Sequence, residues 1–155
     1  MQIISSLVFP HIDYASALFT DMSAGNNLKL QRIQNACIRF ICGAKKYEHL
    51  SPYYKDLGIL KIMERRRLSV AVLIQKVIKT KTPLYLYNMY KFTAVTNVRG
   101  TRSNKLKLQI PIHRLEKFHQ SFLVQSCKIW NDLELYDFSH LSSYSVRNAV
   151  YKMLL

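Results

Sequence analysis

Apolar residues recur at helical spacing through most of this chain and predict a mainly helical fold. The clearest amphipathic segment covers residues 28–43. Its apolar side is formed by Leu30, Ile33, Cys37 and Ile41. Asn26 or Asn27 can cap the start of this helix, and Gly43 can close its end. The segment therefore combines a face for a core with a polar face for solvent or a ligand.

The same spacing predicts further helices. Residues 64–79 form the second strong segment, and its middle, residues 68–74, is apolar on nearly every side, so it should be the most buried element. Other long segments are predicted at residues 3–19 with a kink or restart at Pro10, at 117–133 and at 141–155, with shorter helices at 51–57 and 84–90. We therefore predict a mainly α fold, a helical bundle of about five or six helices.

A different pattern follows residue 95. Residues 105–110 alternate Lys, Leu, Lys, Leu, Gln and Ile, which is typical of a strand or an extended arm with one apolar face. We predict a short extended basic segment between Arg99 and Ile112. The chain is accordingly divided into a helical region, residues 1–95, and a basic extended arm plus C-terminal helices, residues 96–155.

The net charge and its distribution indicate the kind of binding partner. The 155 residues contain 23 Lys and Arg against 9 Asp and Glu, a net charge of +14. The first 95 residues carry fourteen basic and five acidic side chains, residues 96–128 carry seven and one, and the last 27 carry two and three. Such an excess predicts attraction to a polyanion, either nucleic acid or an anionic membrane surface.

Compartment and completeness can also be predicted. The longest apolar run, Val70–Ile74, is far shorter than the ~20 residues that a bilayer requires, so no membrane span is expected. Three cysteines without paired spacing favour a reducing, intracellular compartment, the cytoplasm or nucleus. An apolar pattern begins at once at the N-terminus, which lacks the basic start of a signal peptide, so we expect a fragment of something longer.

Motifs for chemistry are missing from the sequence. It contains no CxxC or HxxxH metal pattern, no GxGxxG or GxxxxGK[ST] phosphate loop, and no closely spaced acidic pair in an apolar setting. A Cys–His nucleophilic site is disfavoured, because Cys37 lies on an apolar helix face. We therefore expect no enzyme activity, no metal and no cofactor.

Six segments carry a resemblance to a known family. In chain order they are FPHIDY (Phe9–Tyr14), LQRIQNACIRFICG (Leu30–Gly43), LSPYYKDLGILKIMERRR (Leu50–Arg67), TPLYL (Thr82–Leu86), TRS (Thr101–Ser103) and KIWNDL (Lys128–Leu133). Together they resemble the thumb-like and downstream region of reverse transcriptases from jockey-like non-LTR retrotransposons. The aromatic–Ala–Asp–Asp signature of that family's catalytic palm is absent, so no catalytic residue carries over. Glu134 stands where a proline usually follows the WN-x-L signature.

The resemblance implies a thumb-like role for the helical region 1–95, in which basic helix faces follow the phosphate backbone of a template–primer duplex without reading its sequence. Three groups are the candidates: a first strip of Lys29, Arg32 and Arg39; a second strip of Arg65, Arg66 and Arg67; and a basic arm of Arg99, Arg102, Lys105 and Lys107. The residues alone leave open two alternatives to phosphate binding: a basic face that contacts only solvent, and specific ion pairs in the second strip. Tyr85, Tyr87 and Tyr90 are candidates for base stacking, although such tyrosines more often border a core.

We therefore predict a non-catalytic nucleic-acid-binding fragment of an RNA-directed DNA polymerase. Its partner would be RNA or an RNA–DNA hybrid, and a polymerase palm domain is a further candidate partner. Two alternatives remain open, a protein-interaction module and a functionally inert remnant of a retrotransposon reading frame. An anionic-membrane binder is disfavoured, since the basic helices lack a Trp-rich apolar face.

Overall fold

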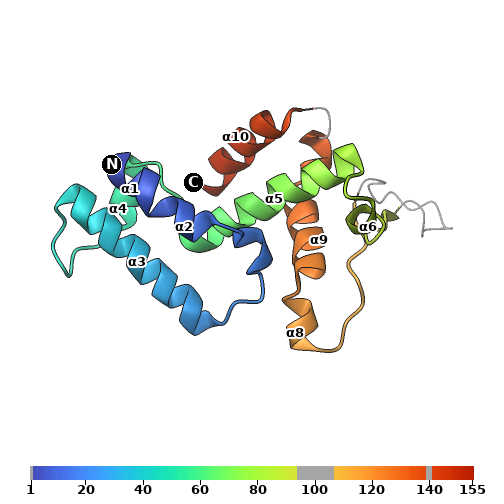
Figure 1. The fold of residues 1–155 in the computed structure, drawn as a ribbon, viewed down its shortest axis with the longest axis horizontal. Helices are drawn as coiled ribbons and strands as arrows, with labels where there is room; N and C mark the ends of the chain where they lie inside the picture. Colours follow the sequence, from blue (N-terminus) through green and yellow to red (C-terminus); the bar gives the residue numbers. More distant parts are fainter. Residues whose placement is uncertain (1, 94–106, 139–140) are drawn as a thin grey trace.

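The computed structural model describes residues 2–93, 107–138 and 141–155, and the described chain is mainly helical, as predicted. Helix α5 (Ile62–Thr80) runs through the middle of the molecule (Figure 1). Helix α9 (Phe122–Asp132) crosses it, and α10 (Ser143–Leu154) lies alongside it. The helices from the first third of the chain gather near the start of α5.

The predicted helix 3–19 is broken into three pieces. They are α1 (Gln2–Leu7), α2 (Phe9–Asp13) and the 3₁₀ helix η1 (Ser16–Leu18). Pro10 lies in the first turn of α2, where its missing N–H costs no helical hydrogen bond. The positive φ of Ala15, 50°, separates α2 from η1. Of the two outcomes predicted at Pro10, a kink or a restart, the structure shows the restart.

Helix α3 (Ala24–Cys42) contains the central amphipathic segment but starts earlier than predicted. Its N-cap is Ser23, whose Oγ accepts a hydrogen bond from the Asn26 N–H at 3.4 Å, so the prediction of an asparagine cap is wrong. Gly43 ends the helix in the left-handed conformation, φ 64°, as predicted.

The buried face of α3 also differs from the prediction. Gln34 and Ile38 are its buried residues, whereas Ile33 is 49% exposed. The rotation of ~100° per residue puts Gln34 in line with Ile38, on the side away from Ile33. The amide of Gln34 is accommodated because its Nε2 donates to the Leu60 carbonyl at 2.8 Å.

The short elements follow the predicted positions more closely. Helix α4 (Ser51–Asp56) and helix α6 (Leu84–Tyr87) form where short helices were expected. The predicted helix 117–133 is divided into α8 (Glu116–His119) and α9, with a break at residues 120–121. The 3₁₀ helix η2 (Leu135–Phe138) follows Glu134, whose φ of 49° proline cannot adopt, so a proline at this position would require a different turn.

Part of the predicted extended segment is described. Leu108 forms an antiparallel bridge with Phe92 and is buried, while its neighbours Lys107 and Gln109 are exposed. The side chain of Asn131 accepts a hydrogen bond from the Leu108 N–H through Oδ1 and donates one to the Leu108 carbonyl through Nδ2, both at 2.9 Å. These bonds attach the segment to α9. Residues 99–106 of the prediction lie outside the described ranges.

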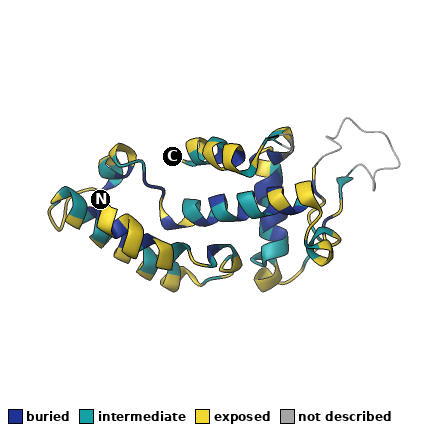
Figure 2. Ribbon diagram, turned by 45° about the horizontal axis from the view of Figure 1, so that its top comes forward, coloured by how far each residue is buried: buried dark blue, intermediate teal, exposed yellow. Residues whose placement is uncertain are grey.

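The core consists of two hydrophobic clusters (Figure 2). The large cluster is centred on residues of α5, α9 and α10, among them Ile74, Trp130 and Val150. The N-terminal cluster comprises Ile4, Phe9, Ile38, Leu50, Tyr54 and Ile59. The predicted division at residue 95 runs through the large cluster, since α5 and Tyr90 lie before it and α9 and α10 after it.

Candidate nucleic-acid interface

Two of the three residues of the first predicted strip lie on one exposed surface, and the third does not. Lys29 and Arg32 are exposed on α3, on the same side as the exposed Ile33 and Phe40. Arg39 is half-buried and turns toward the loop that follows the helix. Its Nε donates to the Lys45 carbonyl and its Nη2 to the Glu48 carbonyl, both at 3.4 Å. The structure therefore brings together Lys29 and Arg32, and gives Arg39 a structural role.

The three arginines of the second strip point in different directions. Arg65 forms a two-bond ion pair with Asp13, with Nε donating to Oδ1 at 2.8 Å, and its guanidinium lies 4.6 Å from the ring centroid of Phe9. Arg66 is buried, 6% exposed, and its Nη1 donates to Asn27 at 2.8 Å. Burial lowers the pKa of the Arg66 guanidinium.

Arg67 completes the second strip with a weaker contact, an ion pair to Glu64 at 3.7 Å. Arg65 and Arg67 thus have specific ion-pair partners, which the sequence left open as the alternative to a binding strip. Arg66 is removed from the surface. This strip holds α5 to α2 and to the start of α3.

The third candidate group is the basic arm. Lys107 is exposed, and its carbonyl accepts hydrogen bonds from the N–H and the hydroxyl of Thr93 at 2.9 and 2.8 Å. Arg99, Arg102 and Lys105 lie outside the described residues. Among the candidate tyrosines, Tyr90 is buried with its hydroxyl 3.0 Å from Ser126, while Tyr85 is exposed. Burial raises the pKa of Tyr90 to about 12.

The loop 44–50, which joins α3 to α4, is a basic and aromatic site that the sequence analysis did not select. It contains the exposed residues Lys45, Lys46, Tyr47 and His49. Tyr47 is 90% exposed, and the Lys46 Nζ lies 5.4 Å from its ring centroid. The signal was present in the sequence as two lysines followed at once by a tyrosine and, two residues later, a histidine.

A pocket of about 370 Å³ opens beside this loop, and we call it the Tyr47 pocket. Its lining is Gln31, Asn35, Arg39, Tyr47, Glu48, His49, Leu50, Ser51, Tyr54 and Lys61. Two of these side chains are basic and one is acidic. The pocket therefore combines polar walls, an exposed aromatic ring and an excess of positive charge.

A hydrogen-bond network forms the inner side of the Tyr47 pocket. The Gln31 Nε2 donates to the Tyr54 hydroxyl at 2.7 Å and to the Asn35 Oδ1 at 3.0 Å, and the Tyr54 hydroxyl donates to the same Asn35 oxygen at 2.6 Å. The Gln31 Oε1 accepts the Ile62 N–H at 3.1 Å. Burial raises the pKa of Tyr54 to about 12, so this hydroxyl stays protonated at neutral pH.

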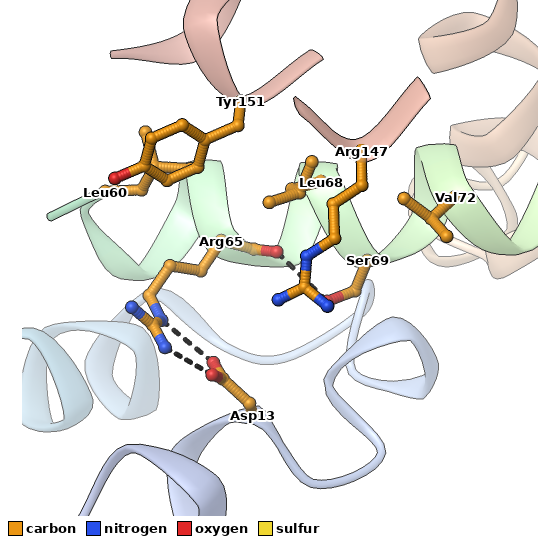
Figure 3. Close-up of a pocket in the computed structure, with 8 residues that line it drawn as sticks. All are labelled: Asp13, Leu60, Arg65, Leu68, Ser69, Val72, Arg147 and Tyr151. Atoms are coloured by element: carbon orange, nitrogen blue, oxygen red, sulfur yellow. Dashed lines mark hydrogen bonds and ion pairs between the residues drawn. The ribbon is translucent and has the colours of Figure 1, made fainter. Parts of the chain in front are cut away.

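A second pocket, of about 350 Å³, lies between α5 and α10 (Figure 3). Arg147 extends over it from α10, and none of the described residues forms a hydrogen bond or ion pair with its guanidinium. The other polar groups at this pocket are already engaged: Arg65 by Asp13, and Ser69 by Ser16 and by the Arg65 carbonyl. The carboxylate of Asp13 also lowers the net positive charge there.

No cluster of three or more His, Cys, Asp or Glu is placed to hold a metal ion within residues 2–93, 107–138 and 141–155. Burial raises the pKa of Cys127 to about 11, so its reactive thiolate is scarce at neutral pH. In the same ranges, no helix has the length and apolar character needed to cross a bilayer.

Comparison with known proteins adds no assignment. No family model, no curated protein and no solved structure matches this chain.

Proposed function

We propose that this chain is a non-catalytic nucleic-acid-binding fragment of a reverse transcriptase from a mobile element. The proposal combines the resemblance of its six segments with one structural observation. Among the described residues, Arg65 and Arg67 are the lysines or arginines that form ion pairs with acidic side chains. Most of the positive charge on the described residues therefore has no acidic partner among them.

The geometry reassigns the contacts within this proposal. Within residues 24–61, exposed basic residues lie on α3, on the loop 44–50, on α4 and between α4 and α5; they are Lys29, Arg32, Lys45, Lys46, Lys55 and Lys61. We propose that these residues contact phosphates, because exposed cations release counterions from a nucleic acid when they bind it. Arg65 and Arg66 are excluded from the interface, since both serve packing within the fold.

Binding across a salt series tests the proposal. The full chain is titrated with a labelled RNA–DNA hybrid, with single-stranded RNA and with duplex DNA. If three to five phosphates are contacted, log K falls against log salt with a slope of roughly −3 to −4.5. A slope near zero, or equal weak binding to heparin and to every nucleic acid, would contradict the proposal.

Charge-removal variants locate the interface. We expect Lys29→Gln combined with Arg32→Gln to reduce the magnitude of the slope by about 2, because each phosphate contact contributes about 0.9. Lys76→Gln combined with Lys91→Gln is the matched control, because it removes the same two charges from exposed lysines outside the proposed contacts, and it should leave the slope unchanged. An equal effect of both double variants would mean that binding follows net charge alone.

A protein-interaction role is the second candidate, and the exposed apolar residues of α1 and α3 favour it. They are Ile3, Leu7, Ile33 and Phe40. The two residues on each helix share one face, and exposed apolar side chains grouped on a helix face are typical of an interface. A polymerase palm domain supplied in trans is the partner to test, with Phe40→Ser expected to weaken the association.

The proposal places the chain in the cytoplasm or nucleus. Its support is the three free cysteines, Cys37, Cys42 and Cys127, which suit a reducing compartment.

A further inference from the structure

We propose that the Tyr47 pocket holds one unstacked base of a single-stranded nucleic acid, with Tyr47 as the stacking face. The inference rests on the proposed function and deepens it, since it names the form of nucleic acid and the place where a base is bound. Four features of the pocket support a bound base: the aromatic ring, the fixed loop, the polar wall and the surrounding positive charge.

The ring has the exposure that stacking requires. Tyr47 is 90% exposed, so a base stacked on the ring face that Lys46 does not cover would remove apolar ring surface from water. Lys45 and Lys46 precede it directly, which places cations within reach of the adjacent phosphates. Stacking on an aromatic ring beside basic residues is the common mode of single-strand binding.

The loop that carries the ring is held in place before any ligand binds. Arg39 binds two of its carbonyls, as described above. The Glu48 carboxylate accepts the Lys45 N–H at 3.0 Å through Oε2 and the Tyr53 hydroxyl at 2.5 Å through Oε1. A preordered loop loses little conformational entropy on binding, so more of the stacking energy contributes to affinity.

The wall of the pocket offers hydrogen-bond groups to a base edge. The Oδ1 of Asn35 is used by Gln31 and Tyr54, while its Nδ2 donates to none of the described residues. Both oxygens of Glu48, the one acidic residue among the lining residues, are already engaged. The pocket volume of about 370 Å³ lies within the range usual for small-ligand sites.

This arrangement favours a single strand over a duplex. A base within a duplex is already stacked and paired, and its extrusion costs free energy that an unpaired base does not pay. Stacking uses the face that all bases share, so little sequence preference is expected. Single-stranded RNA and single-stranded DNA are both expected to bind, because the ring contacts no 2′-hydroxyl in this mode.

The test compares Tyr47→Ala, Tyr47→Phe and Tyr47→Trp in the full chain. Each is titrated with single-stranded RNA, single-stranded DNA and the RNA–DNA hybrid across a salt series. Tyr47→Ala should weaken binding of both single strands by roughly 5- to 150-fold and leave the salt slope unchanged, because the variant removes stacking and no charge. Tyr47→Phe and Tyr47→Trp should retain the affinity, and the added tryptophan fluorescence should be quenched on binding.

Two controls keep the result interpretable. Tyr144→Ala removes a tyrosine of similar exposure on α10 and should bind as the wild type does. Equal melting temperatures of the variants and the wild type would show that the fold is unchanged.

The failures of the two proposals are distinguishable. The pocket proposal would be overturned if Tyr47→Ala bound single strands with wild-type affinity, or if its loss of affinity were confined to the hybrid. In either case the salt slope of the wild type could still support the proposed function. Absence of binding by the wild-type chain to any nucleic acid would overturn both.

Discussion

The two hydrophobic clusters hold their parts of the molecule together in different ways. The large cluster packs fully buried side chains such as Ile74, Trp130 and Val150 around α5, α9 and α10. The N-terminal cluster contains six buried residues, and one of them, Tyr54, also belongs to a polar network with Gln31 and Asn35. The first region depends mainly on apolar packing, and the second depends on packing combined with directed hydrogen bonds.

The difference suggests a division between scaffold and binding surface. Apolar packing fixes position but offers little to a polar ligand, whereas hydrogen-bonded side chains near a surface can present donors in a fixed geometry. The basic loop and the Tyr47 pocket lie beside the N-terminal cluster. The last 27 residues, which include the end of α9 and all of α10, carry a net charge of −1.

Truncation of the large cluster should have the greatest effect. Trp130→Ala removes a side chain that is 2% exposed and is expected to lower the free energy of unfolding by about 3–5 kcal/mol. Chemical denaturation followed by far-UV circular dichroism measures this change. Ile112→Ala, at a side chain that is 96% exposed, should change stability by less than about 0.5 kcal/mol.

The shape of the same denaturation curve bears on the two regions. A single sharp transition would mean that they unfold as one unit, and a resolved second transition would separate them. A broad transition in the wild type would instead favour the inert-remnant alternative.

The contact between the regions is expected to show an intermediate effect. Gln34→Ala removes the bond from α3 to the Leu60 carbonyl and leaves that carbonyl without its partner, at a cost of about 1–3 kcal/mol. Hydrogen exchange should show the loss mainly in α3 and α4. Gln31→Ala is the comparison variant, because it breaks the neighbouring hydrogen-bond network of Tyr54 and Asn35. Loss of exchange protection in Gln34→Ala that was confined to the large cluster would contradict the prediction.

The ion pair between α2 and α5 should contribute less. Asp13→Asn weakens a pair whose side chains are partly exposed, so we expect a loss of roughly 0.5–1 kcal/mol, reduced further at high salt. Glu64→Gln, which removes the longer ion pair to Arg67, is the control and should cost about 0.3 kcal/mol. Equal losses for both would show that the two-bond geometry at Asp13 adds nothing.

The smallest difference between the regions should be their response to alkaline pH. Burial raises the pKa of Tyr54 and of Tyr90 to about 12, above the ordinary value of 10.0. The unfolded chain therefore releases these protons first, and stability should decrease as pH rises from 10 to 12. Tyr54→Phe and Tyr90→Phe should each reduce that decrease by a similar amount, measured from denaturation midpoints at pH 9 to 12. A stability that is constant across this range would contradict the prediction.

The sequence predicted those parts of the fold in which the apolar pattern is unambiguous. Residues 68–74 are apolar on nearly every side, and the structure buries Leu68, Val70, Ala71 and Ile74 within α5, as expected. Gly43 and Pro10 also gave correct boundaries, because their backbone restrictions are local. These features require no knowledge of distant contacts.

The candidate site was less predictable because it depends on partners far away in the chain. Gln31 has the polarity of a surface residue, and its place in the pocket wall depends on the Tyr54 hydroxyl, 23 positions later, and on the Ile62 N–H, 31 positions later. Arg65, Arg66 and Arg67 are equivalent in sequence, yet the turn of ~100° per residue points them in three directions. Whether Lys29 and Arg32 bind phosphate stays a prediction.

The contacts of Arg39 with the loop carbonyls have a consequence for genetics. In a saturation mutagenesis screen scored only by nucleic-acid binding, Arg39 and Tyr47 would give the same phenotype, since loss of either removes the oriented ring. A lysine allele distinguishes a structural role of Arg39 from a phosphate contact: Arg39→Lys preserves the charge but loses the planar fork that reaches two carbonyls, so it should score as a mutant. An allele series that omits lysine would therefore misidentify Arg39 as a point of contact with the nucleic acid.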